Sequence, residues 1–511
     1  MLSDNVLLDI FSFSLCDPAG PPLEQMKKWQ RLVHVCRRWR QIIFSSPRRL
    51  DLRLSCSYGI PVRVRRLRKN LKFWPLTMPL TVDYPDHFSH LSPVDEANIV
   101  AVLKHTRRVR CVEISASLSF MSKVATVMQQ SFPALTHLVL KLDWSDTRFV
   151  LTDANLFILP KGFLNESAPC LQYLSLERFL IPEVPTFLLS SHNLVTLKLE
   201  SMFQASFISP KAMVECLSGM TRLKTLSISF GYDATQAAPD PFAIGPEGSL
   251  ARSDLTTRII LPSLTHFRYV GHSGYSEDLM AQIDAPLLTR LGMSYDGNHF
   301  LGSQIQGSQL SRFIGHIENF DQPSRAKAYF HDGVTVDLDY LHRKGLEASF
   351  SIFLPVYAYI GQQILDTVDF LGELFTTFSS VNHLSVKGSL YFTGDDDMGT
   401  AEWLPFIRLF PAVEGLQLSG AVGADIASSL EGTTEEMVNE VFPTLHAIWI
   451  DDEDEDEDED DYEPLEEESM EQFLSWRQSS GHPVTIVNTQ EELEEKLEKL
   501  ESHRNGQENV L

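Results

Sequence analysis

The chain has 511 residues, of which 43% are hydrophobic and 22% charged, and it carries a formal net charge of -25 at pH 7. This composition suits a globular protein with a sizeable core and excludes a largely disordered chain. No apolar run reaches the roughly 18 residues of a membrane-spanning helix. The amino terminus also lacks the basic and apolar segments of a secretory signal. We therefore expect a protein of the cytoplasm and/or nucleus, without a membrane partner.

The charges are spread unevenly. Between Asp451 and Leu511 there are 23 acidic residues and four basic ones, whereas the stretch from Lys27 to Lys72 has 15 basic residues and a single acid, Asp51. The six cysteines are scattered singly, without a Cys-x-x-Cys pair. This predicts reduced thiols, mostly in the core, and no metal or redox cofactor.

Two amphipathic helices are predicted near the amino terminus. In the first, Val6, Leu7, Ile10 and Phe11 recur at helical spacing, and Ser3 is placed to cap its first turn. The second runs through "WQRLVHVCRRWRQIIF", residues 29–44, as one helix with an apolar face opposite its arginines. Helices this short cannot bury such faces alone, so they must pack on each other or on a partner.

The segments "LSDNVLLDIF" and "LVHVCRRWRQI" resemble the F-box, the module by which substrate receptors dock on the Skp-type adaptor of a cullin-RING ubiquitin ligase. The Val-Cys-Arg-Arg-Trp-Arg run is the most specific part of the resemblance. The resemblance implies apolar side chains buried either inside the module or against the adaptor, and the division between the two stays open. The residues concerned are Leu2, Val6, Leu7, Ile10, Leu32, Val35, Cys36, Trp39 and Ile42.

The chain departs from the F-box pattern in two places. Ser3 stands where the family usually has proline, and "CDPAGPPLEQ", residues 16–25, lengthens the loop between the helices. The alternative interpretation is a two-helix part of an ordinary core, with Trp39 as its packing anchor.

Beyond these helices a sextet of the form L-x-x-L-x-L, or its apolar equivalent, occurs ten times. Proline often precedes it by two residues, as at Pro133 and Pro262, and turns the chain into an extended segment. Such sextets are typical of the strands of leucine-rich repeats. The sextets begin at Val109, Leu135, Leu171, Leu194, Leu223, Leu264, Leu288, Val381, Val413 and Leu445.

These repeats are irregular and lack the asparagine that usually follows the strand motif, so we expect loose turns. Helical spacing in "MSKVATVMQQSF" and "SPKAMVECLSGM" predicts helices between strands, and two weaker repeats are expected at "AKAYF" and "LEASFSI". The alternative is an unrelated α/β fold with leucine-rich buried strands. Combined with the F-box, the sextets resemble the F-box proteins with leucine-rich repeats that are numerous in fungi.

The predicted fold class is therefore α/β, with an N-terminal helical F-box followed by an irregular leucine-rich-repeat solenoid, or horseshoe. The predicted domains are the F-box (1–54), a basic connecting segment or N-terminal cap (55–108), the solenoid (109–450), an acidic disordered insertion (451–468), a closing helix and strand (469–487) and a solvated C-terminal helix or tail (488–511).

Two charged segments invite a functional interpretation. The run "DDEDEDEDEDD", from Asp451 to Asp461, is typical of a solvated loop, and the alternative is a lure for basic partners. The segment "RVRRLRKNLK", from Arg63 to Lys72, suits a basic face near the helical module or, alternatively, a nuclear localisation signal or nucleic-acid patch. It has no interleaved aromatic residues, so we expect no specific nucleic-acid partner.

No nucleophile elbow, P-loop, zinc-protease helix or dinucleotide motif is present, so we expect a non-catalytic protein. The resemblance implies a substrate-recognition subunit of an SCF-type cullin-RING ubiquitin ligase that binds a Skp adaptor and recruits a protein substrate. The alternative is a leucine-rich-repeat scaffold that binds basic proteins through its acidic tract, outside any ligase. Outward-facing strand residues are the candidates for substrate binding: His137, Lys141, Tyr173, Glu177, Lys198, His266, Arg268, Gln417 and Trp449.

Overall fold

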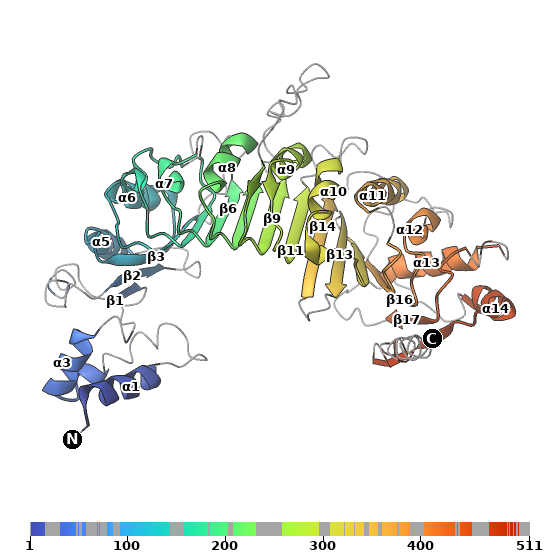
Figure 1. Cartoon of the computed structure of the whole chain (residues 1–511), viewed down its shortest axis with the longest axis horizontal. Coiled ribbons are helices and arrows are strands. Elements are labelled where there is room, and N and C mark those ends of the chain that lie inside the picture. Colours follow the sequence, from blue (N-terminus) through green and yellow to red (C-terminus); the bar gives the residue numbers. More distant parts are fainter. Residues whose placement is uncertain are drawn as a thin grey trace, which may run out of the picture. The chain divides into compact units, whose positions relative to one another are not determined.

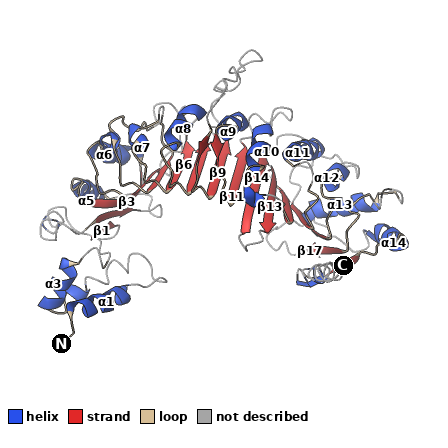
Figure 2. Ribbon diagram, viewed as in Figure 1, coloured by secondary structure: helices blue, strands red, loops and turns tan. Residues whose placement is uncertain are grey.

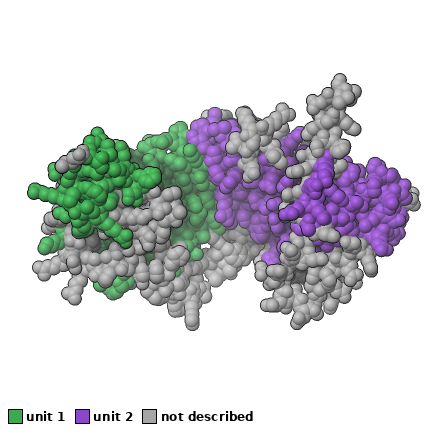
Figure 3. Space-filling view, turned by 90° about the horizontal axis from the view of Figure 1, so that it is seen from below, with its two compact units in different colours: residues 1–241 green, residues 242–511 purple. Residues whose placement is uncertain are grey.

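The structure is a computed structural model of the whole chain, coloured along the sequence in Figure 1 and by secondary structure in Figure 2. It divides into two compact units, residues 1–241 and 242–511 (Figure 3). The residues described are 2–15, 31–46, 50, 54–57, 69, 71, 79–84, 92–143, 157–181, 184–202, 208–230, 258–295, 307–320, 322–331, 333–341, 347–355, 360–375, 378–388, 403–434, 437, 440–451, 470–487, 489, 491–493, 495–496 and 499.

The first unit contains a helix pair and a parallel β-sheet whose strands pair in sequence order. The strands are β1 (Leu54–Ser57), β2 (Leu80–Tyr84), β3 (Val109–Ala116), β4 (His137–Leu142), β5 (Tyr173–Glu177), β6 (Thr196–Met202) and β7 (Thr225–Phe230). The helices are α1 (Asp4–Leu15), α3 (Arg37–Ser45), α5 (Pro93–Leu103), α6 (Leu118–Val127), the 3-10 helix η2 (Phe163–Glu166), α7 (Thr186–Leu189) and α8 (Pro210–Leu217). The sheet thus begins with β1, earlier in the chain than Val109, the residue at which we predicted the repeats to start.

The second unit is built on a mostly parallel sheet in the order β9-β11-β14-β13-β12-β15-β16-β17-β18. Its strands are β9 (His266–Gly271), β11 (Arg290–Tyr295), β12 (Arg325–Phe330), β13 (Gly333–Leu341), β14 (Glu347–Pro355), β15 (His383–Gly388), β16 (Gly415–Ser419), β17 (Ala447–Asp451) and β18 (Thr485–Val487), with β8 (Ile259–Ile260) and β10 (Ile283–Asp284) as a separate pair. Its helices are α9 (Ser273–Met280), α10 (Ser308–Ile314), the 3-10 helix η5 (Glu318–Phe320), α11 (Ile360–Leu374), α12 (Leu404–Arg408), α13 (Gly420–Glu431) and α14 (Glu471–Ser479).

Between β11 and β15 the strand order reverses. Strands β12, β13 and β14 form an antiparallel meander, in which β14 pairs with β11 and β12 pairs with β15. We predicted two successive repeats here, at "AKAYF" and "LEASFSI". Both segments are strands, but they are the outer strands of the meander, so the prediction of their arrangement was wrong. The reason is that apolar alternation looks the same in parallel and antiparallel strands.

The ten sextets all lead into strands, and their first residues explain why. Each of these residues, from Val109 to Leu445, is 0% exposed. The apolar residues that follow alternate along the strand, as in β4, where Leu138 and Leu140 are fully buried and His137 is exposed. Full burial of a leucine contributes about 2 kcal/mol, so the sextets supply a continuous core along each unit.

Helices form where the sequence predicts them between strands. The segment "MSKVATVMQQSF" overlaps α6, and "SPKAMVECLSGM" contains α8, in which the Ser209 hydroxyl accepts the Ala212 N–H at 3.3 Å. Figure 2 shows the connecting helices of each unit gathered along one side of its strands. The other side of each sheet, called here its outer face, carries the side chains that alternate with the core residues.

The C-terminal part of the chain agrees with the prediction in its closing helix and strand and differs from it in the tail that follows. The predicted closing helix and strand are α14 and β18, and Glu495 and Lys499 form an i,i+4 ion pair at 2.6 Å. The predicted solvated tail is wrong at Leu493, which is fully buried with Ala447 and Val487. The acidic run after Asp451 and the basic segment 63–72, except Lys69 and Leu71, lie outside the described residues. In the part of the chain that the structure describes, no helix has the length and apolar content needed to cross a bilayer.

Candidate functional site

The first candidate site is the helix pair of α1 and α3, which has an apolar core of its own. Ser3 caps α1 as predicted, because its hydroxyl accepts the Val6 N–H at 3.4 Å. The Phe11 ring meets the Trp39 ring edge-on, with 4.7 Å between ring centroids. The buried members of this core are Leu7, Leu8, Phe11, Val33, Ile42, Ile43 and Leu50, with Leu32, Trp39 and Phe44 packed partly buried against them.

The second predicted helix is not continuous. The chain turns at His34 and Val35, and Cys36 is the extended N-cap residue of α3, where its Sγ accepts the Trp39 N–H at 3.4 Å. We predicted most cysteines in the core, but Cys36 is exposed and Cys111 is half-buried. A thiol is a weak hydrogen-bond acceptor and is not a usual N-cap residue. The apolar spacing also continues across the break, so the pattern predicted one continuous helix.

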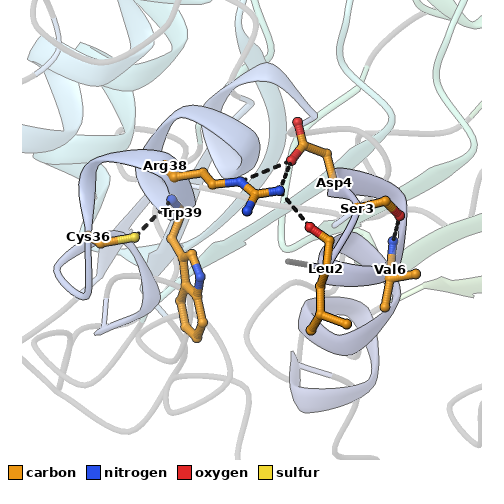
Figure 4. Close-up of polar contacts among 7 residues, drawn as sticks. All are labelled: Leu2, Ser3, Asp4, Val6, Cys36, Arg38 and Trp39. Carbon is orange, nitrogen blue, oxygen red and sulfur yellow. Dashed lines mark hydrogen bonds and ion pairs between the residues drawn. The ribbon is translucent and has the colours of Figure 1, made fainter.

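Arg38 ties the start of the chain to α3. Its guanidinium donates to the Asp4 carboxylate at 2.7 Å and to the Leu2 carbonyl, also at 2.7 Å (Figure 4). Both side chains of the ion pair are more than a third exposed, so the pair adds at most about 1 kcal/mol to stability. Its main effect is geometric, since it holds Leu2 beside the first turn of α1. Figure 4 shows the Leu2 side chain extending away from this contact.

A second apolar face of α1 lies outside the core. Val6, Ile10 and Phe13 follow one another at helical spacing and are 42%, 47% and 85% exposed, and Leu2, before the helix, is 54% exposed. We call Leu2, Val6, Ile10 and Phe13 the apolar stripe. Large exposed apolar residues are ordinary when scattered, but four on one side of one short segment indicate a protein-binding surface.

The structure thus divides the F-box-like residues, which the sequence could not do. Leu7 and Ile42 are buried in the core, and Leu32 and Trp39 pack against it. Leu2, Val6, Ile10, Val35 and Cys36 are exposed. Sequence reasoning missed Phe13, although it continues the spacing of Val6 and Ile10 by one further turn.

The second candidate site is the outer face of the sheets. In the first unit the register brings the expected residues together in pairs. The His137 and Tyr173 rings stack with centroids 5.9 Å apart, and the Lys141 ammonium lies 3.3 Å from the Glu177 carboxylate. Lys198 lies one strand further on, with Glu200 at 3.9 Å. These charges therefore neutralise one another on the surface of the unit.

The remaining expected residues lie in the second unit. His266 and Arg268 share β9, while Gln417 of β16 is opposite Trp449 of β17 in the register. Burial, followed by the charge of Arg290, lowers the pKa of His266. Trp449 is packed against the cluster that contains Leu493, so much of its ring serves the core and not a partner.

Two observations concern the metal-ligating and nucleophilic side chains of the described residues. No group of three or more His, Cys, Asp or Glu side chains among them is arranged to hold a metal ion. Burial raises the pKa of the Cys56 thiol to about 11 and that of Cys216 to about 12, which makes both poor nucleophiles.

No protein-family model and no curated protein sequence matches the chain.

Proposed function

We propose that the protein is a substrate receptor of an SCF-type cullin-RING ubiquitin ligase, in which the helix pair docks on a Skp-type adaptor and the outer faces of the sheets recruit a protein substrate. The observation that carries the proposal is the apolar stripe. It lies on a helix pair that already has a buried core, and the residues of the stripe are not part of that core.

The contribution of such a receptor is proximity. The helix pair holds the ligase, the sheets hold the target, and a lysine of the target gains a high effective concentration near the charged conjugating enzyme. No bond chemistry is required of this chain. A scaffold that binds basic proteins through the acidic tract remains the competing function, and adaptor binding distinguishes the two.

The test is a titration of the full-length protein with a purified Skp-type adaptor. Substituting Leu2→Glu and Ile10→Glu places charges in the stripe and is expected to weaken binding by about a hundredfold or more. Matched controls are Leu287→Glu and Leu189→Glu, because Leu2 and Leu287 are both 54% exposed, and Ile10 and Leu189 are 47% and 49% exposed. The controls should bind normally.

Absence of adaptor binding by the unchanged protein would reject the receptor function. The scaffold would then be favoured if deletion of residues 451–461 removed binding of basic proteins. If the stripe and control variants lost adaptor affinity equally, the loss would not be specific to the stripe. Hydrogen exchange of the α1 and α3 amides checks that the helix pair of each variant stays folded.

A further inference from the structure

The outer faces of the two units differ in the ion pairs that their cationic side chains form. In the first unit Lys141 and Lys198 each lie beside a carboxylate, Glu177 at 3.3 Å and Glu200 at 3.9 Å. In the second unit Arg268, Arg290 and Lys327 form no ion pair and no side-chain hydrogen bond with the described residues. The cations of that face whose side chains the structure describes are Arg268, Arg290, Arg325, Lys327 and Lys387, and the carboxylates are Asp337 and Asp339. Glu347, the first residue of β14, and Asp451, the last of β17, occupy further positions of the same face.

Two of these cations form a compact pair. The register puts Arg290 opposite His266 and Gly292 opposite Arg268, so the two arginines are diagonal neighbours on adjacent strands. Diagonal residues are about 7–8 Å apart, within reach of long side chains. Both arginines are exposed. Two like charges at this distance repel each other, and a carboxylate between them would remove the repulsion and accept hydrogen bonds from both guanidinium groups.

Lys327 provides a second position on the same face. The register runs from Arg268 through Gly292, Ser351 and Asp337 to Lys327. This row crosses four strand spacings, about 19 Å in all, which an extended peptide covers in about six residues. Gly292 and Ser351 are small, whereas Asp337 places a negative charge beside Lys327. A complementary ligand therefore has acidic groups at its two ends and no acidic group in its middle.

We propose that the outer face of the second unit binds an extended segment of a partner protein with two acidic positions about six residues apart, one held by Arg268 and Arg290 and the other by Lys327. The inference rests on the proposed function, which it deepens by naming the class of substrate segment. Charge complementarity selects this occupant, because a basic segment would add repulsion at the Arg268 and Arg290 pair. The net negative charge of the whole chain opposes binding weakly, since salt screens it beyond about 8 Å.

The experiment uses the full-length protein and a fluorescein-labelled peptide of about 12 residues, in which two Glu-Glu pairs are separated by glycine and serine so that they span the row. Fluorescence anisotropy measures binding at several salt concentrations. The variant Arg268→Gln/Arg290→Gln/Lys327→Gln is expected to weaken binding by about tenfold or more. The matched control Lys104→Gln/Arg107→Gln/Lys211→Gln removes three exposed cations of the other unit that lie outside its strands, and it is expected to leave binding within about twofold.

Equal binding of a peptide with glutamine in place of glutamate, or an unchanged affinity in the triple variant, would overturn the inference. Binding that appears only after residues 452–461 are replaced by glycine and serine would assign the face to the acidic tract of the chain itself, and would also overturn it. Adaptor titration of the same samples separates the two proposals. Normal adaptor binding without peptide binding rejects the inference alone, whereas peptide binding without adaptor binding rejects the ligase role.

Discussion

The carboxylate of Glu431, the last residue of α13, accepts a hydrogen bond of 3.1 Å from the backbone N–H of Gln472, in the first turn of α14. Glu277 of α9 does the same for α10, at 2.8 Å from the N–H of Gln309. Neither α10 nor α14 has a side-chain cap of its own, since Gly307 and Met470 occupy those positions. In both cases a glutamate of the preceding helix supplies the missing cap and joins the two helices.

Removing such a cap should loosen the helix it serves. We expect Glu431→Ala to lower the local stability of α14 by about 1 kcal/mol, because two backbone N–H groups lose a charged acceptor near the positive end of the helix dipole. Hydrogen exchange of the α14 amides measures this as roughly fivefold faster exchange. The control Glu318→Ala removes an exposed glutamate of the same unit. If the control accelerated exchange of α14 equally, the cap would not be the cause.

We expect Asp425 of α13 to make the stability of the second unit depend on pH. Burial raises its pKa from 3.8 to about 6, and its Oδ2 is buried without a hydrogen-bond partner. Since the folded chain holds this proton more tightly than the unfolded chain, the stability it contributes is complete below its ordinary pKa and is lost as the pH rises to about 6.

Replacing this carboxyl with its neutral isostere should therefore stabilise the protein at neutral pH. We expect Asp425→Asn to raise the free energy of unfolding at pH 7 by about 1 kcal/mol, after allowance for solvent screening, and to have no such effect below about pH 4. Urea unfolding at both pH values measures it. The exposed Asp369→Asn on α11 is the control, and a gain that persisted in acid would argue against titration as its source.

The meander depends on a glycine. A Cβ at Gly333 would lie 2.6 Å from both the Leu354 carbonyl oxygen and the Phe353 ring, so Gly333→Ala should destabilise the second unit by about 1–3 kcal/mol. A Cβ at Gly372 in α11 would meet nothing within 4 Å, so Gly372→Ala should instead stabilise the helix by about 0.5–1 kcal/mol. Thermal unfolding of the two variants should shift in opposite directions, and a shift in the same direction would contradict the packing of the meander.

The two faces of α1 predict two separable defects. Leu7 is 6% exposed, so Leu7→Ala should cost the helix pair about 2–4 kcal/mol and increase exchange of its amides. Ile10→Ala should change stability by less than about 0.5 kcal/mol and weaken only adaptor binding. A variant at Ile10 that unfolded the pair would show that the stripe is structural after all.

The strands were predictable because their signal is local. Each sextet combines a fully buried first residue with period-two alternation, and both features are visible in a short window of sequence. The same reasoning placed His137, Lys141 and Tyr173 on the outer face. Which of them meet across strands depends on register, so the pairing of Lys141 with Glu177 could not be predicted.

Other features required knowledge of neighbours. Leu7 and Ile10 are both apolar positions of one helix, and only packing shows that one faces α3 and the other faces outward. The break at Cys36 was missed because the apolar period continues through it. The meander was missed because alternation identifies a strand without identifying the strands beside it.

The reversed order of β12, β13 and β14 also bears on how the second unit can be assembled. In a linear array each strand docks on the one made just before it, so the chain can grow or be shortened one repeat at a time. Here β12 pairs with β13 and β15, and it is linked to β11 only through β13 and β14. A nascent chain that ends at Phe330 has β11 and β12 without the strands that join them. The stretch from β11 to β15 must therefore fold as one cooperative block, and truncation within it should remove the whole block and not a single repeat.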